Sequence, residues 1–145
     1  MHCVNPTYNK LSSFFLVFFV SAVKLEAIDF SFPNVSHPQG IVSSTSKTVV
    51  NIDGPSFHIS GGIQNIDTVL HQFNQFNLHQ GEHAVFYDAG FKNTVAQIIG
   101  TDYSWINGKI TSDSNHFFLL NPNGIMFGPG ASLDIAGSFY ASTAD

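Results

Sequence analysis

The most informative part of the sequence is Asn115-His-Phe-Phe-Leu-Leu-Asn-Pro-Asn-Gly-Ile-Met-Phe-Gly-Pro-Gly-Ala-Ser-Leu-Asp-Ile-Ala-Gly-Ser-Phe-Tyr-Ala-Ser-Thr-Ala-Asp145. Two apolar runs flank a tetrapeptide with Pro second and Gly fourth, the arrangement that a type I turn prefers. This tetrapeptide is Asn121-Pro122-Asn123-Gly124, and Ile125 opens the second run. A Gly-Pro-Gly turn at residues 128–130 leads into a further strand. Strand, Asn-rich turn, strand, Gly-rich turn and strand is the order expected for one coil of a β-solenoid.

The segment 131–143 is predicted to be a strand with one face suited to a core. Alternate apolar residues share that face with Gly137. These residues are Leu133, Ile135, Phe139 and Ala141. A solenoid coil buries its end only against another coil, and an open ladder of N–H and C=O groups invites pairing with another chain. We therefore expect the 145 residues to be the N-terminal part of a longer fibrous protein, or a truncated copy of one.

Closely spaced Gly, Pro and Asn residues divide the chain from Ile28 onward into short segments. Runs that favour β-structure lie between them, at residues 48–52, 57–60, 84–87, 117–120 and 125–127. One segment is compatible with a helix, because apolar residues between Ile66 and Phe76 follow helical spacing. The sequence predicts an all-β protein with at most one or two helical turns in that segment.

Composition limits the possible functions. The chain has room for one domain of ordinary size, and only 10% of its residues are charged. The formal net charge is −5, all five cations are Lys, and there is no Arg. Nucleic-acid binding depends on clustered Arg and Lys, so a nucleic-acid partner is not expected.

The N-terminus has the features of a signal peptide. Lys10 precedes an uncharged apolar run over residues 11–23, which is shorter than the roughly 20 residues of a bilayer span. Small residues favour cleavage after Ala22, and Ala27 is the alternative. We expect residues 1–22 to be removed, together with Cys3, the only cysteine. The mature domain, residues 23–145, would then be exported without disulfides.

Residues 115–145 closely resemble the end of the two-partner-secretion domain of the filamentous haemagglutinin family. Four upstream blocks resemble earlier parts of that domain in the same order. They are Gly61-Gly62, Leu70-His-Gln-Phe-Asn-Gln-Phe-Asn-Leu78, Asn93-Thr-Val-Ala-Gln-Ile-Ile-Gly100 and Trp105-Ile-Asn-Gly-Lys-Ile110. The resemblance implies a right-handed parallel β-helix of the pectin-lyase-like kind, with N-terminal capping strands.

The resemblance also implies a function. The domain would be a secretion label that crosses the inner membrane through the general export machinery. In the periplasm it would be recognised by the POTRA domains of an outer-membrane barrel transporter. It would start to fold outside the cell, at the front of a secreted or surface-bound adhesin or haemolysin-type passenger that could contact a host surface or a glycan. Residues Asn121 to Ile125 could contact the transporter, although their spacing is first of all that of a turn.

An enzyme is the least favoured alternative, and no cofactor is expected. The aspartates at 88, 102, 113 and 134 are scattered over predicted turns, and there is no Arg to stabilise charge beside them. A metal site would use His79 and His83 with His71 nearby, but Gly81 disfavours the helix that ligands four residues apart require. The sequence predicts surface histidines and no metal.

A carbohydrate-binding or adhesive module is a further alternative. Four aromatic side chains could provide stacking platforms for sugars, namely Tyr87, Tyr103, Trp105 and Tyr140. Burial in a core is the default for the single Trp of a small β-protein, so Trp105 is predicted to pack inside.

Overall fold

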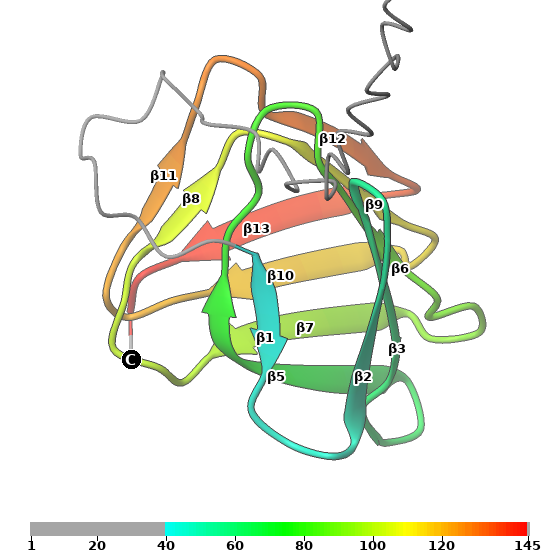
Figure 1. Cartoon of the computed structure of the whole chain (residues 1–145). Coiled ribbons are helices and arrows are strands. Elements are labelled where there is room, and N and C mark those ends of the chain that lie inside the picture. Colours follow the sequence, from blue (N-terminus) through cyan, green and yellow to red (C-terminus); the bar gives the residue numbers. More distant parts are fainter. Residues whose placement is uncertain (1–39, 145) are drawn as a thin grey trace, which may run out of the picture.

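A computed structural model describes residues 40–144 of the chain, which are entirely strands, turns and loops (Figure 1). The strands are β1 (Ile41–Ser43), β2 (Thr48–Asp53), β3 (Ser56–Gly61), β4 (Ile63–Gln64), β5 (Thr68–Phe76), β6 (His83–Phe86), β7 (Asn93–Ile98), β8 (Ser104–Ile106), β9 (Lys109–Ser112), β10 (His116–Leu120), β11 (Ile125–Phe127), β12 (Ser132–Ile135) and β13 (Ser138–Ser142). Within residues 40–144 there is no helix long and apolar enough to cross a membrane. The predicted signal peptide and its cleavage site at Ala22 lie outside the described residues.

The strands wind into a solenoid of about four coils. One face consists of β3, β6, β9 and β12, a second of β5, β7, β10 and β13, and a third of β8 and β11. Strands within these sets pair in parallel, so that Thr68 pairs with Asn93 and Asn93 with His116. The distance along the chain between such partners in successive coils lies within the ~20–50-residue repeat of solenoid proteins. The second face appears in Figure 1 as stacked rungs, which confirms the predicted parallel β-helix.

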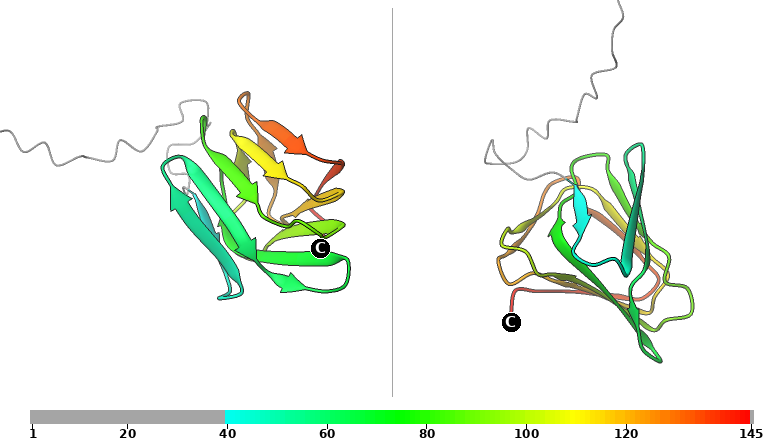
Figure 2. Two further views of the ribbon diagram at one scale, coloured as in Figure 1. Left: turned by 90° about the vertical axis from the view of Figure 1, so that its right-hand side faces the viewer. Right: turned by 60° about the horizontal axis from the view of Figure 1, so that its bottom comes forward.

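Antiparallel strands cover the N-terminal end of the solenoid. β1 and β4 pair antiparallel with β5, and β2 pairs antiparallel with β3. These are the predicted capping strands. At the other end of the stack, no strand within residues 40–144 pairs with the outer edges of β11, β12 and β13. The two ends are therefore different, with β2 and β12 on opposite sides of the stack in the left view of Figure 2.

Inward-facing side chains of successive coils form a single core rich in phenylalanine. Phe86 and Phe117 make an edge-to-face contact with ring centroids 4.8 Å apart, and Phe117 stacks on Phe139 at 5.9 Å. Aromatic pairs of this kind add about 0.5–1.5 kcal/mol beyond the burial of apolar area. Trp105 is 5% exposed, which confirms its predicted burial.

The segment in which a helical turn was predicted is a strand. β5 buries Val69, His71 and Phe73 at alternate positions, the period of a strand with one buried face. Ile66, which contributed to the helical spacing, is 91% exposed. The helical prediction was wrong because the spacing included Ile66 and Leu70, which do not lie on the buried face, and left out His71, which does.

The segment 131–143 contains two strands instead of the single strand that was predicted. β12 and β13 are separated by a corner at Ala136 and Gly137, and Ile135 and Phe139 pack against the core. A Cβ atom on Gly137 would overlap the backbone carbonyl oxygen of Asn115 in the coil beneath. Glycine is therefore required at this corner because two coils come into close contact there.

Candidate functional site

The candidate recognition residues Asn121 to Ile125 form a corner of the solenoid between β10 and β11. The backbone N–H of Gly124 donates to the carbonyl oxygen of Asn121 at 3.1 Å, the hydrogen bond that closes a four-residue turn. Ile125 is half-buried and packs against the core. The predicted turn is thus present, and the corner lies directly on the corresponding corner of the coil beneath.

Asn121 ties these two corners together. Its side chain is completely buried, and its Nδ2 donates to the carbonyl oxygen of Asp102 at 3.0 Å and to Oγ of Ser104 at 2.9 Å. Its Oδ1 accepts from the backbone N–H of Asn123 at 2.9 Å. Because the whole amide group is used inside the protein, the Asn121 side chain is not available on the surface of the folded coil.

Asn123 and Pro122 are the exposed members of the turn. Nδ2 of Asn123 donates to the carbonyl oxygen of Gly100 at 2.8 Å and to Oδ1 of Asn121 at 3.2 Å. A partner that meets the folded domain would therefore contact the Pro122 ring and the outer side of Asn123. The two asparagines of the motif differ in accessibility, which their spacing in the sequence did not reveal.

The histidines predicted to lie on the surface are partly buried. His71 is fully buried and its Nε2 lies 3.0 Å from Oδ1 of Asp88, which is 2% exposed. Thr94 Oγ1 donates to the same carboxylate at 2.8 Å. His79 is also buried, so the surface prediction was wrong for both histidines. The buried cluster of His71, Asp88 and Thr94 joins the first and second coils.

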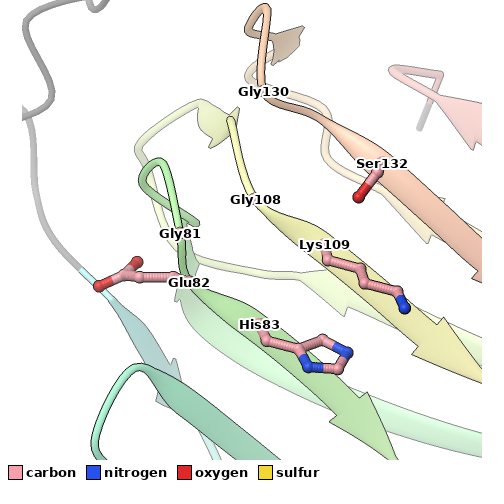
Figure 3. Close-up of a pocket in the computed structure, with 7 residues that line it drawn as sticks. All are labelled: Gly81, Glu82, His83, Gly108, Lys109, Gly130 and Ser132. Carbon is pink, nitrogen blue, oxygen red and sulfur yellow. The ribbon is translucent and has the colours of Figure 1, made fainter.

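A shallow hollow of about 290 Å³ lies where three coils turn into the face containing β6, β9 and β12. It is lined by Gly81, Glu82, His83, Gly108, Lys109, Gly130 and Ser132 (Figure 3). Nζ of Lys109 forms an ion pair with Asp134 at 2.9 Å, and Nε2 of His83 lies 2.7 Å from Oγ1 of Thr111. The side chains that could act as acid, base or cation are thus already engaged by other protein groups.

The electrostatics of this hollow follow from those contacts. Burial lowers the pKa of His83 from its ordinary value of 6.5, and the positive charge of Lys109 lowers it further. The hydrogen bond and charge of Lys109 lower the pKa of Asp134. His83 is therefore neutral at pH 7, and Asp134 carries a negative charge.

The other candidate residues are not gathered into one site. Tyr87 and Tyr140 are 58% and 47% exposed, but Tyr87 follows β6 and Tyr140 lies in β13, on different faces. Asp134 lies within β12 and Asp88 is buried, so neither is in an exposed turn. In the part of the chain that the structure describes, no three His, Cys, Asp or Glu side chains come close enough to hold a metal. Among residues 40–144, Tyr87 and Tyr140 thus do not share a platform, and Tyr140 instead stacks on Phe118 with ring centroids 4.8 Å apart.

Comparison with known proteins identifies the family. No curated protein matches the chain. The family model of the TPS secretion domain matches residues 37–145, which include every strand of the solenoid. This domain targets proteins for two-partner secretion, in which an outer-membrane transporter exports its partner protein, and it is not a catalytic family. The chain therefore belongs to the TPS secretion domain family, as the resemblance to the filamentous haemagglutinins had indicated.

Proposed function

We propose that this domain is the recognition label and folding nucleus of a filamentous-haemagglutinin-like exoprotein. Residues 1–22 act as a signal peptide, and residues 23–145 pass through the periplasm to the POTRA domains of a dedicated outer-membrane transporter. The passenger is of the adhesin or haemolysin type. The domain has no catalytic role and needs no cofactor.

The observation that carries this proposal is the match to the TPS secretion domain over a solenoid whose two ends differ. Antiparallel strands cover the N-terminal end, whereas β11, β12 and β13 have outer edges that no described strand pairs with. Each new coil can therefore add to the last one, in the order in which the chain arrives. Folding on the outer side of the membrane would favour outward movement, because a folded coil cannot return through the transporter.

Within the domain, we assign transporter contact to the turn from Asn121 to Ile125. Pro122 and Asn123 are the parts of this turn that a partner can reach on the folded coil, whereas Asn121 can be reached only before the coil has folded.

A secretion assay tests the proposal. The full chain is fused to a cysteine-free reporter and co-expressed with a candidate two-partner-secretion transporter, and the reporter is measured outside the cell. We expect secretion that depends on the transporter and that the double substitution Asn121→Ala/Asn123→Ala abolishes. Asn115→Ala is the matched control, because Asn115 is an exposed asparagine at the other end of β10. Secretion that needs no transporter would refute the label, and equal loss in the control would refute the assignment to the turn.

Sequencing the N-terminus of the exported protein tests the signal peptide. We expect the mature chain to begin at Val23, and cleavage after Ala27 would make Ile28 the first residue instead. An exported chain that still begins at residue 1 would refute the signal-peptide assignment without affecting the role of the domain.

A further inference from the structure

The Asn-Gly dipeptide at the recognition turn is the starting point for an inference about chemical modification. Asparagine followed by glycine is prone to deamidation, because glycine has no Cβ to block attack by its own backbone nitrogen on the preceding side chain. Residues 40–144 contain two such pairs, Asn107-Gly108 and Asn123-Gly124. Both lie at corners of the solenoid.

The folded structure restrains both partners of this reaction at Asn123. The N–H of Gly124, whose nitrogen is the attacking atom, donates to the carbonyl oxygen of Asn121 at 3.1 Å. The amide group that would be attacked is held to the coil beneath, since Nδ2 of Asn123 donates to the carbonyl oxygen of Gly100 at 2.8 Å. Asn121 adds a third restraint, because its Oδ1 accepts the backbone N–H of Asn123.

Asn107 is restrained in a different way. It is fully buried, and its Oδ1 accepts the backbone N–H of Gly130 at 2.6 Å. Opening this corner requires the coil above it to move, whereas opening the exposed corner at Asn123 requires only that the turn itself loosen. The two pairs therefore have the same chemistry and different protection.

We propose that Asn123 is a spontaneous modification site whose reaction is controlled by folding of the turn. When the turn is open, the nitrogen of Gly124 bonds to Cγ of Asn123, the Cγ–Nδ2 bond breaks, and ammonia leaves with the proton from Gly124. Water then opens the resulting succinimide ring at one carbonyl or the other, which gives aspartate or isoaspartate. No oxidant, reductant or further reactant is required.

The modified turn cannot re-form its original contacts. A carboxylate at position 123 has no N–H to donate to the carbonyl oxygen of Gly100 and would place negative charge beside it. Isoaspartate would also lengthen the backbone within the turn. An exported chain that stays unfolded too long would thus lose the turn, a consequence that rests on the proposed function, whereas the reaction itself does not.

Peptide mass spectrometry of the purified full chain tests this proposal, with aspartate and isoaspartate measured at both positions over time. In urea we expect similar conversion at Asn107 and Asn123. In the folded protein we expect conversion at Asn123 to be at least about tenfold slower than in urea, the factor that corresponds to roughly one net hydrogen bond. Equal rates at Asn123 in the folded and unfolded protein would overturn the proposal.

Variants test whether the turn itself controls the reaction. Asn121→Ala removes the side-chain restraint on Asn123, so we expect faster conversion at Asn123 while Asn107 stays protected. Ser104→Ala, which removes one hydrogen-bond acceptor of Asn121, is a milder second variant with the same expected order. Ser114→Ala is the control, because this buried serine contacts Ser112 and not the turn. Equal acceleration at both asparagines, or none in either variant, would show that the turn does not control the reaction. None of these measurements uses a transporter, so the result is independent of the secretion assay.

Discussion

Replacing Asn121 by alanine should destabilise the protein far more than the same change at Asn123. The Asn121 side chain is completely buried and donates two hydrogen bonds to the coil beneath, at 3.0 Å and 2.9 Å. Losing two such bonds costs about 2 kcal/mol, and leaving the buried Ser104 hydroxyl without this donor adds roughly 1 kcal/mol. The free energy of unfolding should therefore fall by about 3 kcal/mol. Asn123→Ala removes two hydrogen bonds of an exposed side chain, to the carbonyl oxygen of Gly100 and to Oδ1 of Asn121, and should cost only about 1 kcal/mol because water can replace them.

Urea unfolding followed by tryptophan fluorescence measures this difference. Trp105 is the only tryptophan and is buried. It lies in β8, directly beneath β11, where it pairs with Met126 just after the turn. We expect a much lower midpoint for Asn121→Ala with an unchanged slope, and a small shift for Asn123→Ala. The exposed control Asn115→Ala should change stability by less than about 0.5 kcal/mol. Equal shifts for the two turn variants would refute the conclusion that Asn121 fixes the corner.

Three further substitutions test other parts of the solenoid. Gly137→Ala should prevent normal stacking of the last described coil, because the new methyl group overlaps a carbonyl oxygen of the coil beneath. Circular dichroism and the urea midpoint would show this loss. Asp88→Ala should cost roughly 2–4 kcal/mol, measured by the same unfolding experiment, since it leaves the buried His71 and the Thr94 hydroxyl without their carboxylate acceptor. Lys109→Met should raise the pKa of Asp134, measured by NMR titration, because the hydrogen bond and charge that lower it are removed. Because folding lowers the pKa of Asp134, its ionised carboxylate stabilises the folded protein above the unfolded pKa, and this stabilisation is lost as the pH falls through the folded pKa. In Lys109→Met this pH-dependent stabilisation should disappear.

The architecture could be predicted because its signals are local. The turn at residues 121–124 has its preferred residue at each position, and the short apolar runs between glycines and prolines correspond to strands of the solenoid. The capping strands and the parallel helix followed from the resemblance of several blocks in a fixed order. The turns and short strands depend on neighbouring residues, so one sequence is enough to reveal them, whereas the parallel winding and its cap needed the resemblance.

The errors arose where a residue is satisfied by a distant partner. His71 faces the core because Asp88 on the next coil is its hydrogen-bond partner, and Thr94 donates in turn to that carboxylate. Nothing near His71 in the sequence indicates this. The same residue concealed the alternation of β5 and made a helical turn plausible. Gly137 was placed inside one long strand because its contact with the coil beneath depends on how two coils stack. Contacts between coils are not encoded in the spacing of a single segment.

The different positions of Asn121 and Asn123 also bear on when the transporter meets the domain. A transporter that contacts the folded coil can reach Asn123 but not the buried amide group of Asn121. If recognition follows folding, secretion should be lost in Asn123→Ala, which keeps most of its stability, and retained in Asn121→Ala wherever that variant is still folded. If recognition precedes folding, both side chains are equally accessible, and loss of secretion should be unrelated to the loss of stability. Measuring secretion and unfolding for the same two variants therefore distinguishes recognition of an unfolded chain from recognition of a folded coil.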